Sequence, residues 1–468
     1  MASVSHGDLL TLDIEKFADK GASLARVDGY VIFVEDAVPG DRVKAYVYQA
    51  KSSFAKAKLD TLIEPSPLRT EPRCRYADTC GGCARQHVTY EAQLEAKQQS
   101  VQEAFAHHSD FSDVEVPPVI GMEEPFYYRN KMDFDFSADR WLTRDEIDSG
   151  QDFDTDFALG MHAPGHFDKV LDLHECHLQS DMSARLVNGV RDFVKEQGWA
   201  PWDIRKQKGY LRHLVIREGK RTGDLMVNLV TYGRNAERRD AFADFLQRAF
   251  PEVTTFVDTD HTGKSHNVEG DTQTVFGPGT IDDIIGDYRF TISPQSFFQT
   301  NTQQAERLYQ IARDFADLQP TDTVYDLYCG AGTISLFLSD AVEQVVGVEL
   351  IEEAVDDARA NAAQNDVSNC TFEAGDLKTV FTDDFVETHG APDVLIVDPP
   401  RNGMHKKVTA QIKALRPERF VYVSCNPQTQ VRDLDRLRDT YRIDAVQPVD
   451  MFPHTPHIEN VVALSRKG

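Results

Sequence analysis

The C-terminal third of the sequence alternates between strand-like and helix-like segments, and this alternation constrains the fold more than any other feature. Apolar residues recur with helical spacing at 304–318 and 351–364, whereas 393–400 and 420–427 are short, continuously apolar runs. Runs of that kind are typical of strands buried on both faces of a parallel sheet. From about residue 303 the sequence therefore predicts an α/β fold with a doubly wound parallel sheet.

The N-terminal part has a different pattern. Short segments that alternate between apolar and polar residues occur at 9–15, 30–35, 41–49 and 54–63, which predicts a small β-barrel. A proline-containing linker follows, then a helix predicted at 90–107 and a mixed α+β region. With about 150 residues per domain as a guide, we expect a barrel domain at 1–65, a central domain at 66–290 and the α/β domain at 291–468.

The composition excludes several classes of protein. A hydrophobic content of 41% is ample for packed cores, and no apolar run approaches the roughly 18 residues that a membrane span needs. No basic, apolar leader opens the sequence, so we expect a cytoplasmic protein without a membrane partner. Seven scattered cysteines do not suggest a secreted disulfide framework, and they indicate metal ligation or thiol chemistry instead.

The charge is distributed unevenly. A net charge of −26 argues against a nucleic-acid partner, because phosphate binding needs a basic surface. However, the segment from Arg42 to Leu59 holds five basic residues and no acid, and the segment from Arg205 to Arg221 holds seven basic residues and one acid. Basic islands on an acidic protein suit a high-salt cytoplasm, which we hold as a hypothesis.

Two motifs in the α/β region predict a cofactor site. The segment 326–333, Asp-Leu-Tyr-Cys-Gly-Ala-Gly-Thr, places glycines where a strand turns into a helix, and Glu349 ends the next strand, where a carboxylate can bind ribose hydroxyls. The third glycine of the dinucleotide motif is absent, which suits S-adenosylmethionine because that cofactor has no pyrophosphate. Asp398-Pro-Pro-Arg401 closes another strand at the same edge; a proline-terminated strand with an N-capping Asp398 is the structural alternative.

Cys425 is the candidate nucleophile. A single cysteine is more often a small core residue, but Cys425 ends a predicted strand at the ligand-binding edge and is followed by a polar Asn-Pro turn. Sulfur is intrinsically nucleophilic, and local charges tune its ionisation. His457 and Glu459, two residues apart, point the same way on an extended segment; we expect an acid or base there rather than a zinc site.

A second group of cysteines has metal-type spacing. Cys74, Cys80 and Cys83 are clustered, with glycines at 81 and 82 that permit a tight loop. Thiolates bind both zinc and iron–sulfur clusters, and spacing does not choose between them. A fourth ligand must come from elsewhere, and Cys176 is the natural candidate because the remaining cysteines belong to the α/β region.

These motifs, together with Ser293–Asn301 (SPQSFFQTN) and Phe452–Glu459 (FPHTPHIE), resemble the RNA uracil-5-methyltransferase family. Within it the chain is most similar to the branch that modifies 23S ribosomal RNA. The resemblance implies an N-terminal TRAM barrel that binds RNA, a central domain with an iron–sulfur cluster, and a C-terminal Rossmann-like domain that binds S-adenosylmethionine.

The resemblance also implies roles for individual residues. It makes Cys425 the nucleophile that adds to carbon 6 of uracil and Glu459 the base that removes the proton from carbon 5. It also implies that S-adenosylmethionine is bound by Gln299, Tyr328, Glu349, Asp376 and Asp398. The ligands that it implies for a 4Fe-4S cluster are Cys74, Cys80, Cys83 and Cys176. Two alternatives stay open: the same chemistry on the T loop of transfer RNA, and a non-catalytic RNA-binding assembly factor. We expect a monomer.

Overall fold

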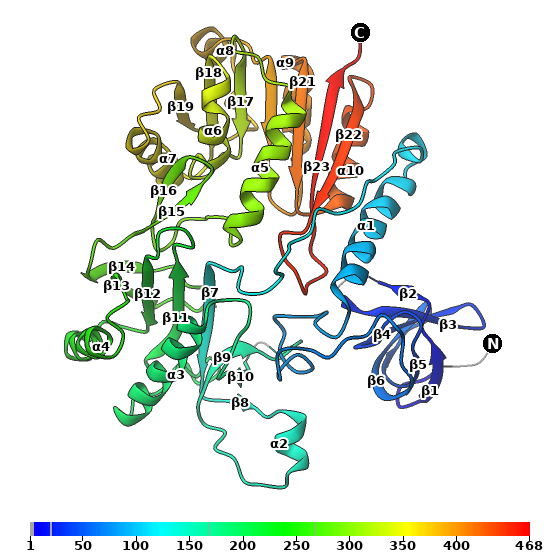
Figure 1. Cartoon of the computed structure of the whole chain (residues 1–468), viewed down its shortest axis with the longest axis vertical. Coiled ribbons are helices and arrows are strands. Elements are labelled where there is room, and N and C mark those ends of the chain that lie inside the picture. Colours follow the sequence, from blue (N-terminus) through cyan, green and yellow to red (C-terminus); the bar gives the residue numbers. More distant parts are fainter. Residues whose placement is uncertain (1–3, 19–20, 167, 266) are drawn as a thin grey trace.

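The computed structural model describes residues 4–18, 21–166, 168–265 and 267–468. A C-terminal lobe lies above a central sheet and the N-terminal barrel in Figure 1. No helix in the described part of the chain is long and apolar enough to cross a membrane.

The barrel is a six-stranded sheet with the order β1-β5-β6-β4-β3-β2. Its strands are β1 (Leu9–Asp13), β2 (Lys16–Phe17), β3 (Ser23–Val27), β4 (Tyr30–Glu35), β5 (Arg42–Ala50) and β6 (Phe54–Glu64). Along β5, Val43, Ala45 and Val47 are buried inside the barrel while the alternate residues Lys44 and Tyr46 face outward. The four predicted strands are confirmed, and β2 and β3 were not predicted.

The central region contains an eight-stranded sheet with the order β14-β13-β12-β11-β7-β9-β10-β8. Its strands are β7 (Lys131–Ser137), β8 (Arg140–Trp141), β9 (Ala158–His162), β10 (Val170–Asp172), β11 (Leu211–Glu218), β12 (Leu225–Thr231), β13 (Thr255–Asp260) and β14 (Asp271–Phe276). Helices α3 (Asp181–Glu196) and α4 (Ala236–Ala249) share one hydrophobic core with this sheet, and the short α2 (Arg144–Asp148) lies in the loop after β8. A separate hairpin, β15 (Ile281–Ile285) with β16 (Tyr288–Ile292), leads to the C-terminal lobe.

The C-terminal lobe is built on a seven-stranded sheet with the order β19-β18-β17-β20-β21-β23-β22. Its strands are β17 (Thr323–Leu327), β18 (Gln344–Glu349), β19 (Cys370–Ala374), β20 (Val394–Val397), β21 (Arg419–Ser424), β22 (Tyr441–Val449) and β23 (Glu459–Arg466). The first five strands in that order are parallel, as predicted. β23 is antiparallel to both of its neighbours, so two C-terminal strands complete the predicted parallel sheet and make it a mixed one.

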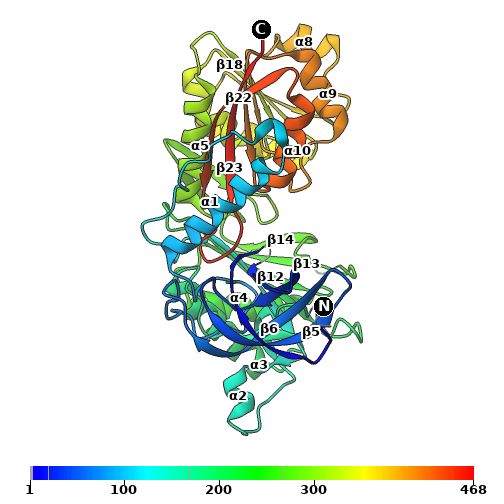
Figure 2. The ribbon, with the colours of Figure 1, turned by 90° about the vertical axis from the view of Figure 1, so that its right-hand side faces the viewer.

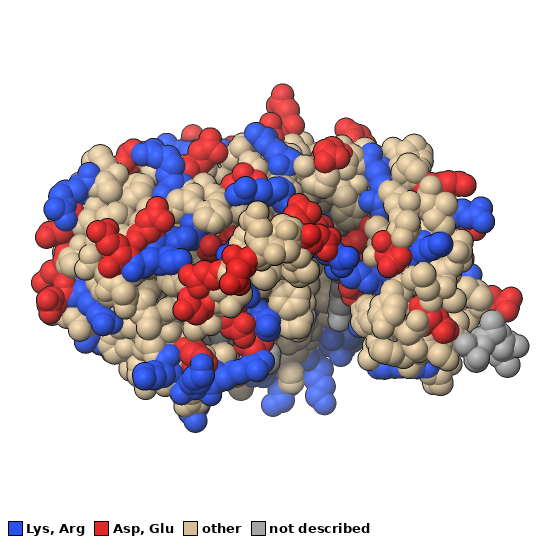
Figure 3. Space-filling view, turned by 90° about the horizontal axis from the view of Figure 1, so that it is seen from below, with Lys and Arg blue, Asp and Glu red and all other residues tan. Residues whose placement is uncertain are grey.

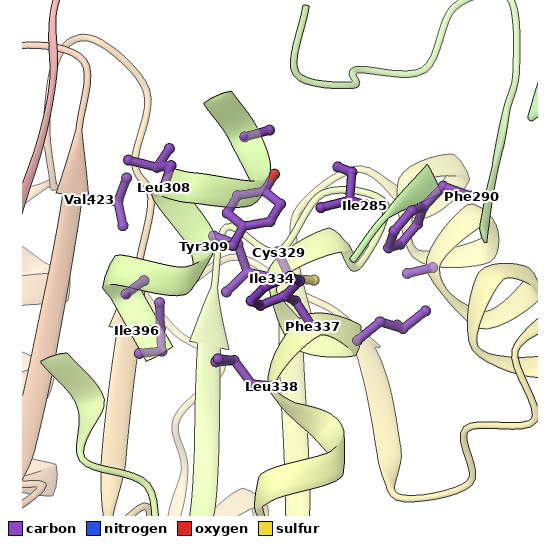
Figure 4. Packing of buried hydrophobic residues seen from close by; sticks show 14 of the residues in the cluster. Ile285, Phe290, Leu308, Tyr309, Cys329, Ile334, Phe337, Leu338, Ile396 and Val423 are labelled. Atoms are coloured by element: carbon purple, nitrogen blue, oxygen red, sulfur yellow. The ribbon is translucent and has the colours of Figure 1, made fainter. Parts of the chain in front are cut away.

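Helices cover both faces of this sheet. One face packs against α5 (Thr302–Ala316), α6 (Thr333–Leu338) and α7 (Glu352–Gln364), and Figure 4 shows Tyr309, Ile334 and Phe337 gathered around the sulfur of Cys329 in this core. The other face packs against α8 (Asp383–His389), α9 (Lys406–Leu415), α10 (Pro427–Leu437) and α1 (Tyr90–Ala106). Although α1 precedes the central sheet in sequence, it lies beside α10 on the C-terminal sheet (Figure 2).

A buried ion pair joins α1 to the loop that connects β22 and β23. Lys97 Nζ donates to Asp450 Oδ1 at 2.5 Å and to the carbonyl of Phe452 at 3.0 Å, and both charged side chains are completely buried. Tyr90 OH donates to the other carboxylate oxygen of Asp450 at 2.9 Å. Burial lowers the pKa of Lys97 to about 8, although Asp450 opposes that shift. The charge on Lys97 therefore depends on its partner.

Removing that partner should destabilise the fold. Asp450→Asn leaves a buried cation without its counter-charge, and we expect the free energy of unfolding at pH 7 to fall by about 3 kcal/mol. The loss should be smaller at pH 9, because Lys97 is already neutral above its lowered pKa in both proteins. Urea denaturation of both proteins at the two pH values measures the difference.

The matched control is Asp439→Asn, which breaks the exposed pair with Lys413 at 2.8 Å. An exposed pair contributes about 1 kcal/mol or less. If Asp439→Asn and Asp450→Asn lower the free energy of unfolding by the same amount, the buried pair has no special role in stability.

Candidate active site

The candidate site lies at the edge of the C-terminal sheet where the parallel strands end. Ligands of open α/β sheets bind at that edge. Tyr328, Asp398 and Cys425 follow the ends of β17, β20 and β21, respectively. Because β23 runs in the opposite direction, its first residue, Glu459, also lies there. The sheet thus brings four of the predicted residues to one edge.

The turn after β17 leaves open space beside the backbone. Tyr328, Gly330 and Gly332 all have positive φ angles, of 66°, 53° and 77°. A Cβ atom at Gly332 would lie 2.9 Å from Phe372 and 3.0 Å from Ala358, so glycine is required for packing there. A Cβ atom at Gly330 would meet nothing within 4 Å, which is the space that a cofactor close to the backbone needs.

Glu349 ends β18 and organises this turn. Its carboxylate accepts hydrogen bonds from the backbone N–H of Gly330 at 3.2 Å and from those of Leu350 and Ile351 at 2.7 and 3.1 Å. Asp376 follows β19, the next strand, and pairs with Lys378 at 3.0 Å. Hydrogen bonds from Lys378 lower the pKa of Asp376. Glu349 therefore binds the glycine turn directly. Asp376 acts on the same turn through its charge, because burial and the charges of Asp433 and Asp376 raise the pKa of Tyr328 to about 12.

Gln299 lies in the loop before α5. The main chain of this loop is held by Asn130, whose side chain donates to the carbonyl of Gln299 at 2.8 Å and whose backbone N–H donates to that of Thr300 at 2.9 Å. The Asn130 side chain also donates to Thr302 Oγ1 at 3.0 Å. No pattern in the sequence indicated Asn130, because its partners are 169 or more residues away.

Two carboxyl groups, those of Asp326 and Asp398, lie within β17 and directly after the neighbouring strand β20, respectively. Asp326, within β17, is completely buried and accepts a hydrogen bond from Ser335 Oγ at 2.6 Å. Burial raises the pKa of Asp326 to about 7, and burial together with the negative charge of Asp326 raises the pKa of Asp398 to about 7. Asp326 was in a predicted motif but was not predicted as a site residue; a charged residue inside an apolar strand was the available signal.

The Asn-Pro sequence after Cys425 begins a helix. Asn426 is the N-cap of α10, since its side chain accepts hydrogen bonds from the backbone N–H groups of Gln428 and Thr429 at 3.2 and 3.4 Å. Pro427 occupies the first helical position, where its missing N–H is not needed. The turn therefore holds the half-buried Cys425 between a strand end and a helix N-terminus.

Glu459 faces Cys425 across two antiparallel strands. β21 and β23 pair with Ser424 opposite Asn460, so the register continued by one residue sets Cys425 opposite Glu459. Directly opposed residues in such a pair have Cβ atoms about 5 Å apart. Burial, followed by the charge of Asp398, raises the pKa of Glu459 well above its usual value. The candidate nucleophile Cys425 thus lies directly opposite a carboxyl group, Glu459, whose pKa is raised.

Arg401 is the cation of this cluster. Its guanidinium lies 2.7 Å from His457 Nδ1, and its carbonyl accepts hydrogen bonds from Asn426 Nδ2 and Thr429 Oγ1, both at 3.2 Å. Burial, with a contribution from Arg401, lowers the pKa of His457, so its ring is neutral. Among the described residues no group of ligands here could hold a metal ion. His457 contacts the guanidinium of Arg401.

Burial and charge oppose each other at Cys425. Burial raises the pKa of the thiol to about 11, Glu459 and Asp398 add to the shift, and Arg401 opposes it. Cys425 is therefore a protonated thiol in the free protein at neutral pH. Formation of the thiolate depends on losing a proton and on the positive charge of Arg401.

The other predicted cysteine group also gathers in the structure. Cys83 packs with Cys176, whereas Cys74 and Cys80 pack together around Tyr76 and two leucines. All four are free thiols whose pKa values are raised mainly by burial, and Cys176 adds to the shift at each of the other three. Within the described chain no three ligands are arranged to hold a metal ion. The donor chemistry suits a group bound by four thiolates, whose identity stays a prediction.

Comparisons with known proteins agree with this geometry. Residues 271–467 match the family model described as tRNA (Uracil-5-)-methyltransferase, and residues 4–59 match that of the TRAM domain. A protein of Porphyromonas gingivalis described as an uncharacterized RNA methyltransferase is 42% identical over 97% of this chain and 99% of its own length. A protein of Halalkalibacterium halodurans with the same description is 38% identical over 100% of this chain and 99% of its own.

A solved structure is similar over the whole chain. The tRNA (uracil-54, C5)-methyltransferase of Pyrococcus abyssi, in complex with S-adenosyl-L-homocysteine, covers 97% of this chain and 100% of its own with a TM-score of 0.78 and 29% identity. Fold and site together define an S-adenosylmethionine-dependent methyltransferase. The chain belongs to the RNA uracil-5-methyltransferase family and carries an N-terminal TRAM domain. The predicted α/β fold with a TRAM barrel and a C-terminal methyltransferase domain is therefore confirmed, whereas the iron–sulfur cluster of the central domain stays a prediction.

The reactivity of Cys425 should follow its pKa. Alkylation by iodoacetamide should be slow at pH 7 and rise about tenfold per pH unit towards pH 10, because only the thiolate reacts. Arg401→Gln should slow the reaction at pH 8 by about two- to fivefold, since it removes the exposed cation that favours the thiolate. Mass spectrometry of the peptide that contains Cys425 measures the rate.

Arg401→Lys keeps the charge and serves as the control. Rates that are equal for Gln and Lys at position 401, or independent of pH, would show that this electrostatic account of the thiol is wrong.

Proposed function

We propose that this enzyme transfers a methyl group to carbon 5 of a uridine in 23S ribosomal RNA, giving 5-methyluridine, through a covalent intermediate on Cys425. The observation that carries the proposal is the register that sets Cys425 opposite Glu459 at the ligand-binding edge of the sheet. A nucleophile and a base on one side of a cleft are what carbon-5 methylation of uracil requires.

The residue chemistry follows the needs of the ring. Carbon 5 of uracil is a weak nucleophile. Cys425 therefore first loses its thiol proton to the solvent, and the thiolate adds to carbon 6 and pushes electrons towards carbon 5. S-adenosylmethionine supplies the methyl group that carbon 5 takes up. Arg401 stabilises the thiolate before addition. It also lowers the pKa of Glu459, which favours the carboxylate form that acts as the base.

Glu459 completes the reaction in the proposal. It takes the remaining proton from carbon 5, the electrons of that C–H bond restore the ring double bond, and the bond between carbon 6 and Cys425 breaks to return the thiolate. Its raised pKa makes the carboxylate a stronger base than an exposed one. On the cofactor side we assign Gln299, Tyr328, Glu349, Asp376 and Asp398. The open space beside Gly330, whose backbone N–H donates to Glu349, supports this assignment.

The barrel supports an RNA substrate. The outer face of β5 and β6 presents Lys44, Lys56 and Lys58, and Tyr46 is paired with Lys58 across these strands. Cations bind phosphates, and aromatic rings stack on unpaired bases. Seen from below, a hollow separates the barrel from the central region, and Lys and Arg side chains lie in and beside it (Figure 3).

Two RNA substrates are candidates. The combination of a TRAM barrel with the cysteine group resembles the branch of the family that acts on ribosomal RNA, which we place first. Transfer RNA is the second candidate, favoured by the similarity to the Pyrococcus abyssi enzyme over the whole chain. The same assay on both RNAs separates them.

We assign Cys74, Cys80, Cys83 and Cys176 as ligands of a 4Fe-4S cluster. Such a cluster is held by four cysteine thiolates. The four thiols lie in one part of the central region, since burial and, in addition, the charge of Cys176 raise the pKa of each of the other three. The cluster would tie the loop of residues 74–83 to the loop that holds Cys176, next to Tyr128, whose hydroxyl donates to the carbonyl of Pro453 in the site loop. Its proposed role is structural, because the methylation needs no electron transfer.

The nucleophile is tested with RNA that contains 5-fluorouridine. Fluorine at carbon 5 cannot be removed as a proton, so wild-type enzyme with S-adenosylmethionine should form a stable covalent RNA adduct through Cys425. Cys425→Ala should give neither adduct nor 5-methyluridine on 23S transcripts or transfer RNA. If the variant behaves like the wild type, or if neither protein reacts with either RNA, the proposal fails.

Glu459→Gln tests the last step. With ordinary RNA this variant should turn over about 10²- to 10⁴-fold more slowly, because it lacks the base, while the methylated adduct on Cys425 accumulates. Denaturing electrophoresis detects the adduct. Slow turnover without adduct would assign Glu459 to an earlier step.

Metal analysis tests the cluster. Protein purified without oxygen should contain about four irons per chain and absorb visible light, and Cys80→Ser should lose both properties. Cys370→Ser, in the C-terminal lobe, is the matched control that should keep them. One zinc per chain without iron would overturn the assignment.

A further inference from the structure

The second basic run of the sequence, Arg205 to Arg221, is only partly exposed: Arg205, Lys206 and Lys208 are exposed, whereas Arg212 and Arg217 are buried. Arg212 is buried and donates to the carbonyls of three residues between 261 and 265 at 2.6–2.8 Å. Arg217 is buried and donates to the carbonyl of Ser296 at 2.7 Å. The remaining members that line a cavity, Arg205 and Lys206, pair with carboxylates. The run therefore builds a structured site rather than a general surface for phosphates.

That site is a cavity of about 280 Å³ in the central region, distinct from the candidate active site. It lies beside the last residues of β7 and β9 and the first residue of β10. Its lining is contributed by four segments, at 136–139, at 162 with 168 and 170, at 202–206, and at 212–213.

The charges of the lining are balanced. Lys206 lies 2.8 Å from Asp203, and Arg205 contacts Asp168. The third cation, Arg212, is held by backbone carbonyls, and the third acid, Asp139, lies 3.4 Å from Lys169. A phosphate would have to compete with a carboxylate for the two exposed cations. The cavity therefore suits a neutral ligand with hydrogen-bond donors and acceptors.

The walls are rigid and partly aromatic. The Trp202 indole stacks on Tyr232 with ring centres 4.1 Å apart, and the Arg212 guanidinium lies 5.3 Å from the indole centre. The Asp135 carboxylate lies 2.7 Å from His213 Nδ1 and 3.3 Å from His162 Nε2, which fixes both rings in the wall. Flat rings beside fixed polar groups favour a planar, hydrogen-bonding ligand.

We propose that this cavity binds a nucleobase of the RNA substrate, at a nucleotide other than the one that is methylated. The proposal rests on the proposed RNA methylation and adds a site that reads flanking sequence. Strand β7 connects the candidate active site with the cavity. It begins at Lys131, next to Asn130, which holds the loop of Gln299. It ends at Ser137, which lines the cavity. Seven strand residues span about 20 Å, a distance that a few nucleotides of single-stranded RNA cover.

Filling the cavity tests the proposal. Ala138 lines it and is half-buried, so Ala138→Trp should occupy the space of the ligand. Ala249→Trp, on the exposed end of α4 in the same region, is the matched control. We expect Ala138→Trp to raise the KM for RNA and to weaken RNA binding by about tenfold, a loss typical of one stacked base. The KM for S-adenosylmethionine and the melting temperature should match those of the control.

Binding is measured by filter retention of 23S and transfer RNA transcripts, and also by cross-linking of 4-thiouridine RNA to full-length protein. Cross-links in residues 136–139 or 202–206 of the wild type, lost in Ala138→Trp, support the proposal. Equal RNA affinity in both tryptophan variants overturns the proposal. It is also overturned if Ala138→Trp abolishes the binding of AMP or UMP but leaves the binding of RNA unchanged. Wild-type protein that binds RNA at the cavity yet forms no 5-methyluridine would refute the proposed reaction and leave the subsite standing.

Discussion

The site depends on one backbone pairing, the antiparallel insertion of β23 between β21 and β22. Parallel strands bring their last residues to the ligand-binding edge, whereas an antiparallel strand brings its first. Glu459 is the first residue of β23. The pairing of β23 with β21 therefore places it opposite Cys425 directly, as part of the strand. A parallel strand in this position would carry Glu459 to the opposite edge, about 20 Å away.

Residues from outside the C-terminal sheet hold the loops of the site. Asn130 holds the main chain at Gln299 and Thr300, and Lys97 holds Asp450 at the start of the segment that leads to Glu459. These contacts are buried hydrogen bonds and an ion pair, which are directional and therefore position a loop more narrowly than apolar packing does. The part of the chain before residue 131 thus belongs to the active site physically, although it supplies no predicted catalytic residue.

Local periodicity predicted the regular elements well. The helix predicted at 90–107 is α1 (Tyr90–Ala106), and the buried runs near 393–400 and 420–427 are β20 and β21. The two-residue strand β2 was missed because so short a segment has no periodicity. The role of Arg212 was also missed, because its partners are carbonyls about 50 residues away and its charge alone predicted an exposed cation.

The sequence by itself determined which functional groups are present: two glycines in a strand–helix turn, a thiol before an Asn-Pro helix start, carboxylates at strand ends and three cysteines with ligand spacing. Each of these follows from residue type and from neighbours a few positions away. Only the tertiary structure decided that Cys425 faces Glu459, 34 residues later, and that α1 covers the C-terminal sheet. Strand direction and helix docking depend on contacts between distant segments, and an apolar run has the same pattern whichever way its strand points.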